Sequence, residues 1–154
     1  MFATATQHRY LRNMMTSDER YERFCADIKT VGLRMTEQRK VILRVLADSS
    51  DHPDANELYH RAYTIDGSVS LSTVYRTLRL LEDKGAIQRH AFDEGRARFE
   101  NTDTEHHDHL IDLDSHAVIE FRSEKIEKLQ AEIAAELGYD IVRHKLELYC
   151  RKRA

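Results

Sequence analysis

The stretch LSTVYRTLRLLEDKGAIQRHAFDEGRARFE, residues 71–100, decides the fold, because its hydrophobic period changes once, at Gly85. Before that glycine, leucines and a valine recur at the three- and four-residue spacing of one helix face. After it, residues 86–92 and 96–100 alternate as strands do, around an Asp-Glu-Gly turn. A helix followed directly by a β-hairpin predicts the second half of a winged helix-turn-helix.

The predicted helix also has a polar face, on which two arginines, a tyrosine and a serine gather without an acid. Helix-turn-helix proteins place such a face in the major groove of DNA. Taken alone, the face is equally compatible with a solvated surface, but the helix order and the hairpin favour DNA. An arginine before the second helix could add a backbone or minor-groove contact. The predicted DNA-binding set is Arg34, Ser72, Thr73, Tyr75, Arg76 and Arg79.

The sequence before this stretch has the spacing of three further helices. Residues 19–31 carry apolar side chains at helical intervals, Thr36 can cap the next helix, and Asp54 begins a capping-box spacing. Residues 1–18 show no clear period, which predicts either a mobile arm or a frayed helix start. We therefore predict a winged-helix domain over residues 19–101.

The composition changes in residues 102–154, which predict a small α/β unit and hence an α+β fold for the whole chain. LIDL, AVIEF and YDIVRHKLELYC have the pattern of strands. Residues 123–137 have the pattern of an amphipathic helix that Gly138 ends. A unit of about 50 residues is near the lower limit for a stable core. Dimerisation through its sheet would solve that problem.

The segment HHDH, residues 106–109, places four metal-ligand side chains in consecutive positions. Alternate side chains of a strand face opposite sides. His107 and His109 therefore share one face, and His106 and Asp108 share the other. One short strand would supply two ligands to each of two metal sites, and each pair needs partners from elsewhere in the chain.

The missing partners can be narrowed by position. Glu100 ends the hairpin strand and His52 begins the third helix, so both could complete a site with His107 and His109. His144 has the strand parity that faces the amphipathic helix, where Glu127 lies in the first turns. Both could meet His106 and Asp108. For any single one of these side chains, a solvated or hydrogen-bonded role is the simpler reading. We expect His8, His60, His90 and His116 to be surface residues.

Composition limits the other possibilities. No apolar run approaches the ~18 residues that span a bilayer, and the N-terminal residues lack the pattern of a signal peptide, so we expect a cytoplasmic protein. The net charge of −3 does not by itself argue for nucleic acid. The two cysteines, Cys25 and Cys150, are too few for a four-thiolate zinc site and are expected to be buried hydrophobes.

With these residues in hand, the chain resembles the ferric uptake regulator family of metal-dependent repressors. The resemblance rests on GLRMTEQR, DHPDANELY, LSTVYRTLRLLEDKG, FDEGRARFE, HHDHLIDL, VIEF and HKLELY, in that order. It implies a winged-helix domain, a C-terminal dimerisation domain and a homodimer on AT-rich inverted repeats of double-stranded DNA. Dimer and tetramer both remain open. It also implies an interdomain regulatory site of His52, Glu100, His107 and His109, and a second site of His106, Asp108, Glu127 and His144.

The resemblance has one departure. Many family members carry a CxxC after HHDHLI that helps to bind a structural zinc, but here Asp112 and Ser115 stand in its place. We therefore expect no structural thiolate zinc, as in the branch that includes manganese uptake regulators. The remaining nitrogen and carboxylate ligands suit Fe²⁺, Mn²⁺ or Zn²⁺. In the cell, Fe²⁺ or Mn²⁺ is the expected effector.

Two alternatives stay open on the sequence. Histidines and carboxylates could form a small metal-dependent enzyme, although no nucleophile motif or cofactor loop accompanies them. The chain could also be a metal buffer in which the helix-turn-helix is only a scaffold.

Overall fold

The computed structural model describes residues 15–92 and 95–154. They form two compact units, one that ends at Glu105 and one that begins at His106. Residues 1–14 of the predicted arm, with His8, lie outside the described residues, as do Asp93 and Glu94 of the predicted turn. Within the described part of the chain, no helix is both long and apolar enough to cross a membrane.

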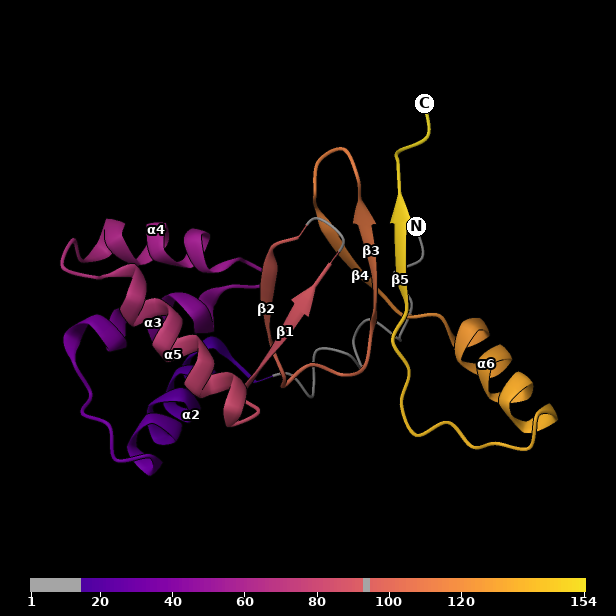
Figure 1. Cartoon of the computed structure of the whole chain (residues 1–154), viewed down its shortest axis with the longest axis horizontal. Coiled ribbons are helices and arrows are strands. Elements are labelled where there is room, and N and C mark those ends of the chain that lie inside the picture. Colours follow the sequence, from indigo (N-terminus) through magenta and orange to yellow (C-terminus); the bar gives the residue numbers. More distant parts are fainter. Residues whose placement is uncertain (1–14, 93–94) are drawn as a thin grey trace. The chain divides into compact units, whose positions relative to one another are not determined.

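Four helices form the body of the first unit (Figure 1). Each begins at a side chain that accepts a hydrogen bond from the first turn, as the sequence predicts for the helices that follow Thr36 and Asp54. The helices and their caps are α2 (Ser17–Thr30, Thr16), α3 (Glu37–Asp48, Thr36), α4 (Ala55–Ile65, Asp54) and α5 (Leu71–Asp83, Ser70). Helix α2 thus starts inside the segment predicted as an arm.

The core of this unit is the meeting point of the apolar faces of all four helices. Val74, Leu78 and Leu81 of α5 are completely buried, as their spacing predicts, and they join Ile28 of α2 and Leu43 of α3 in one cluster. Burying each such side chain contributes about 1.5–3 kcal/mol. This packing fixes the rotation of α5, so that its polar face is the one left outside.

A two-stranded hairpin follows α5. Strand β1 (Ile87–Ala91) pairs antiparallel with β2 (Ala97–Asn101), and Gly95 adopts a φ of +80° beside the turn. Ile87 and Phe99 extend the helical core onto the hairpin. Helices α3 to α5 followed by this hairpin make a winged helix-turn-helix, which confirms the predicted fold class for this part of the chain.

The second unit is a three-stranded sheet with one helix. Strand β3 (Asp108–Asp112) lies in the centre, antiparallel to β4 (Val118–Phe121) and parallel to β5 (Glu147–Cys150). Helix α6 (Glu124–Glu136) ends in two hydrogen bonds that wrap around Gly138, whose φ is +83°. The strand predicted over residues 139–150 is confined to its last four residues, because β3 offers only a short edge to pair with.

Helix α6 buries none of its residues within the described chain. Its apolar side chains remain uncovered, with Leu129 55%, Ile133 48% and Leu137 70% exposed. The helix stands beside the sheet rather than over it (Figure 1). Among the described residues, the apolar stripe of this amphipathic helix therefore has no covering element.

Candidate metal centres and the exposed face of the recognition helix

One complete ligand cluster lies within the second unit. His106 and Asp108 come from β3 and the residues just before it, Glu127 from the first half of α6, and His144 from the segment leading into β5. Ligand atoms of all four side chains lie within 4.8 Å of one another. The Nε2 atoms of His106 and His144 are 2.8 Å apart, and His144 Nε2 is 3.3 Å from Asp108 Oδ1. The structure thus brings together the four residues that the sequence grouped as a second site.

The acid at the centre of this cluster has the environment of a metal ligand. Asp108 is 1% exposed, and among the residues that the structure describes neither of its carboxylate oxygens accepts a hydrogen bond. A buried carboxylate without donors is costly, so such groups are normally paired or coordinate a metal. One oxygen of Glu127 faces the cluster in the same condition. Two imidazoles and two carboxylates fit a divalent ion with nitrogen and oxygen preferences.

The other two histidines of HHDH turn the opposite way, as strand alternation predicts. The rings of His107 and His109 contact each other edge to face, with centroids 4.9 Å apart. Glu120 of β4 lies opposite His109 in the strand register, and its carboxylate is 3.8 Å from His107 Nε2. Sequence reasoning missed Glu120, since only the β3–β4 register identifies it as a neighbour.

The remaining pair of predicted ligands, His52 and Glu100, lies in the first unit. His52 Nε2 is 3.3 Å from Glu100 Oε2, and both side chains are largely buried. The turn before α4 is fastened to β2 by hydrogen bonds from Arg98 to the His52 carbonyl and from the Phe99 N–H to the Pro53 carbonyl. This anchoring holds His52 at a φ of +53°, a conformation unusual for a residue with a side chain.

His90 is not the surface residue that the sequence predicted. It is only 4% exposed, and its Nε2 is 2.7 Å from Glu100 Oε2. No other ligand-type side chain lies near His90 in the sequence, because the residue it contacts comes from the paired strand. His60 and His116 are exposed, as expected. Cys25 and Cys150 are free and half-buried rather than fully buried.

The polar face of α5 is open in the structure. Ser72, Arg76 and Arg79 are exposed, and the Tyr75 side chain is 52% exposed. Thr73 differs from the rest of the predicted set, because it is buried and its hydroxyl lies 2.8 Å from that of Ser70. A residue that serves the helix cap presents no free hydroxyl on the outer face.

Two further features border this face. Arg34 is exposed in the segment that leads into α3. A hollow of about 720 Å³ separates α5 from the hairpin, and Tyr75, Arg79, Arg89 and Arg96 line it together with acids. Arg96 is held there by an ion pair of 3.1 Å with Asp54. The hollow thus carries carboxylates as well as arginines, with Asp54, Glu82 and Asp83 among its lining residues.

The turn after β3 shows what stands where a CxxC would lie. The Asp112 carboxylate accepts hydrogen bonds from the Ser115 hydroxyl, at 2.7 Å, and from the Asp114 N–H, at 3.0 Å. The Ser115 hydroxyl, and then the Asp114 N–H, hold the pKa of Asp112 below its ordinary value. A hydrogen-bonded turn thus closes the β3–β4 connection without a thiolate.

A winged helix with an open cationic face, joined to a unit that gathers imidazoles and carboxylates, defines a metal-responsive DNA-binding regulator. Comparison with known proteins agrees: the sequence model of the ferric uptake regulator family matches residues 30–149. The chain belongs to this family. It is therefore a metal-responsive transcriptional regulator and not an enzyme, and the metal-buffer and enzyme alternatives are not favoured.

Individual relatives extend over most of the chain. The ferric uptake regulation protein of Brucella abortus is 56% identical over 126 residues, covering 82% of this chain and 89% of the relative. A solved structure of a zinc-bound manganese uptake regulator is 54% identical, with a TM-score of 0.74, and covers 84% of this chain and 98% of its own. The Helicobacter pylori ferric uptake regulator, described as having three functional metal-binding sites, has a TM-score of 0.82 at 30% identity, covering 92% and 95%.

Proposed function

We propose that this chain is a homodimeric repressor that binds AT-rich inverted repeats of double-stranded DNA when loaded with divalent metal. Tyr75, Arg76 and Arg79 would read the major groove from α5, and Ser72 and Arg34 would contact the backbone or the minor groove. A twofold dimer presents two such helices, and an inverted repeat offers two matching half-sites. The predicted division into residues 19–101 and 102–154 assigns DNA to the first domain and dimerisation to the second. Such a regulator would act in the cytoplasm, where the DNA is.

Dimerisation is supported by the uncovered face of α6. Leu129, Ile133 and Leu137 form an apolar stripe on a unit of 49 residues, which is small for an independent core. A second copy with the same stripe would cover it, because twofold interfaces are self-complementary. A tetramer made of two such dimers is the alternative.

The switch that we propose depends on two half-sites. His52 and Glu100 lie together in the first unit, and His107 and His109 lie together in the second. Two ligands are too few for a stable divalent site, which needs four to six. An ion that takes ligands from both units would favour one arrangement of the DNA-binding unit, and would shift the population by its differential affinity. Glu120 could add a carboxylate from the second unit.

The second site would act differently, because all of its ligands belong to one unit. The observation that carries its assignment is the buried Asp108 carboxylate, which lacks a hydrogen-bond donor among the described residues. An ion held by His106, Asp108, Glu127 and His144 would tie α6 to the sheet without depending on the first unit. We therefore propose that this site stabilises the dimerisation unit.

The donor atoms favour several divalent ions. Both ligand sets are nitrogen and oxygen, which accept Fe²⁺, Mn²⁺ and Zn²⁺, and the intrinsic affinity order would place zinc above the other two. We propose that the supply of Fe²⁺ or Mn²⁺ in the cell selects the effector, while Zn²⁺ or Mn²⁺ can occupy the sites in vitro. The regulated genes would then belong to iron or manganese homeostasis.

The experiment that tests this function is fluorescence anisotropy on an AT-rich inverted-repeat duplex at fixed salt, since salt alone changes affinity by orders of magnitude. Chelator-stripped protein is titrated with Mn²⁺ or anaerobic Fe²⁺. We expect tight binding only with metal. We also expect His107→Ala to lose most of the metal dependence, whose usual size is ~1–3 kcal/mol.

His60→Ala is the matched control, because His60 is an exposed histidine on α4, outside both clusters. It should keep the full metal response. If His107→Ala responds to metal as the unchanged protein does, the regulatory-site assignment is wrong. If the stripped and loaded proteins bind a panel of such duplexes equally well, the metal switch itself is wrong.

A further inference from the structure

We infer that His90 is a positioning residue that holds the Glu100 carboxylate in the orientation needed for metal binding. His90 was not among the predicted ligands, and it belongs to β1, the first strand of the hairpin. The inference rests on the proposed role of Glu100 as a ligand of the regulatory site. In this role, the hairpin would help to bind the metal by orienting Glu100.

Strand pairing brings the two side chains together. His90 lies opposite Arg98 in the β1–β2 register, and Glu100 is two residues further along β2. Residues two apart in a strand share a face, so His90 and Glu100 are diagonal neighbours on one side of the hairpin. The contact that results is short, with 2.7 Å between His90 Nε2 and Glu100 Oε2.

The His90 ring itself is held in place. It is buried, and it stacks on Phe92 with a centroid distance of 5.4 Å and an angle of 2° between the planes. Phe92 lies two residues after His90, just beyond the end of β1. A ring clamped in this way can donate its Nε2 hydrogen in only one direction, toward Glu100.

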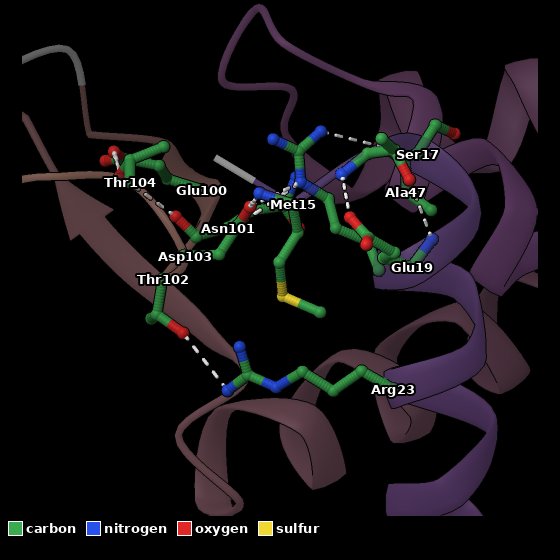
Figure 2. Close-up of polar contacts among 12 residues, drawn as sticks. Met15, Ser17, Glu19, Arg23, Ala47, Glu100, Asn101, Thr102, Asp103 and Thr104 are labelled. Atoms are coloured by element: carbon green, nitrogen blue, oxygen red, sulfur yellow. Dashed lines mark hydrogen bonds and ion pairs between the residues drawn. The ribbon is translucent and has the colours of Figure 1, made fainter. Parts of the chain in front are cut away.

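Glu100 is fixed from several sides at once. Its Oε2 faces His90 at 2.7 Å and His52 at 3.3 Å, and the Thr104 hydroxyl donates to its Oε1 at 3.3 Å. Figure 2 shows Thr104 and Glu100 beside the loop that follows β2. A carboxylate oxygen has two lone pairs, so Oε2 can accept from His90 and still bind an ion next to His52.

The position of His90 suits a residue that orients the ligand Glu100 and does not itself bind the metal. A hydrogen bond to a ligating carboxylate fixes its orientation, and losing such an outer partner typically costs 10–100-fold in metal affinity. His52 faces the same oxygen from the turn before α4. The hairpin and that turn would therefore hold His52 and Glu100 side by side before the ion binds.

The test measures Mn²⁺ affinity of the full chelator-stripped chain by titration calorimetry. His90→Phe keeps an aromatic ring against Phe92 but removes the donor, and we expect about 10–100-fold weaker binding at one of the two sites. His90→Gln places an amide N–H at similar reach, and we expect it to restore affinity to within a few-fold. Affinity at the second site should not change in either variant, which gives an internal control.

Two comparisons make the outcomes distinguishable. Glu100→Gln tests the proposed function: if Mn²⁺ affinity does not fall, Glu100 is not a ligand and the regulatory site is wrong. If Glu100→Gln weakens binding but His90→Phe does not, only the positioning role is overturned. If His90→Phe lowers the thermal midpoint of the stripped protein, the comparison of His90→Gln with the shorter His90→Asn decides whether the hydrogen-bond donor matters for metal affinity. Equal weakening by both would refute a role for the donor.

Discussion

Replacing Asp103 tests how firmly the segment between the two units is fastened to the first unit. The Nε atom of Arg20, on α2, lies 3.1 and 3.0 Å from the two oxygens of Asp103. Met15 donates its backbone N–H to the same carboxylate, and Figure 2 shows Met15 and Asp103. Asp103 follows Glu100, the proposed metal ligand, by three residues. This ion pair therefore fixes the first part of the connection on the body of the first unit.

The size of the effect follows from burial. The Arg20 and Asp103 side chains are only 13% and 5% exposed, so Asp103→Ala leaves a guanidinium in a nearly dry site. Removing one partner of a buried pair costs about 3–5 kcal/mol. Arg20 keeps a hydrogen bond to the Ala47 carbonyl, so we expect the lower end, about 3 kcal/mol. That is a large part of the 5–15 kcal/mol typical of a domain.

The assay is urea unfolding of the chelator-stripped protein followed by far-ultraviolet circular dichroism, which reports mainly on the four helices of the first unit. The metal must be removed because a bound ion would itself raise the free energy of unfolding. The matched control is Asp18→Ala. Asp18 pairs with Arg44 at 2.7 Å, but the two side chains are 87% and 38% exposed, and such pairs contribute at most about 1 kcal/mol.

Equal destabilisation by the two variants would refute the reasoning, because the Asp103 pair is buried and also accepts the Met15 N–H, whereas the Asp18 pair is exposed. The reasoning would also be refuted if Asp103→Ala kept the free energy of unfolding of the unchanged protein and only lowered the m-value. The substitution would then act on the denatured state. A further variant, with Arg20→Met added to Asp103→Leu, should recover most of the loss. Replacing both partners by apolar groups removes the uncompensated charge.

Two other predictions concern acid stability and assembly. The Arg61 guanidinium, which donates to Asp51, lowers the pKa of Asp51 below its ordinary value. A depressed folded-state pKa stabilises the protein above the unfolded value, near 3.9, and this contribution disappears as the pH falls through the folded-state pKa. Because Asp51 is exposed, the loss should be at most about 1 kcal/mol, and Asp51→Asn should remove this part of the acid dependence in unfolding curves between pH 5 and 2. Ile133→Glu places a charge in the uncovered stripe of α6 and should give monomers in sedimentation velocity. Lys128→Ala, an 80% exposed control on the same helix, should leave the dimer intact, and a dimeric Ile133→Glu would contradict the proposed interface.

Local spacing could predict the helices and strands whose side chains repeat at a regular interval along the chain. The α5 stripe repeats every three to four residues, and the following hairpin repeats every two, so a change of period at Gly85 identified both. The HHDH segment was informative for the same reason: strand alternation separates His107 and His109 from His106 and Asp108, and the structure places them so.

The parts that could not be predicted depend on pairing between distant segments. His90 looked like an isolated surface residue, because its contact with Glu100 requires the exact β1–β2 register. Glu120 depends in the same way on the β3–β4 register. The pair of Arg20 and Asp103 is separated by 83 residues, and no spacing rule connects two such positions. Thr73 was included in the predicted DNA-binding set, but it is buried and its hydroxyl lies beside that of the cap residue Ser70.

The backbone at His52 bears on whether the first-unit pair is structural or functional. A φ of +53° costs a residue with a side chain about 1–3 kcal/mol, whereas glycine adopts it freely. The position also precedes Pro53, which ordinarily favours extended backbone. The anchoring bonds from Arg98 and the Phe99 N–H use only backbone carbonyls, so they do not depend on the His52 side chain. The buried His52 ring lies with its Nε2 3.3 Å from Glu100 Oε2. Glycine would therefore relieve the strain, but it would also remove the imidazole that we propose as a metal ligand.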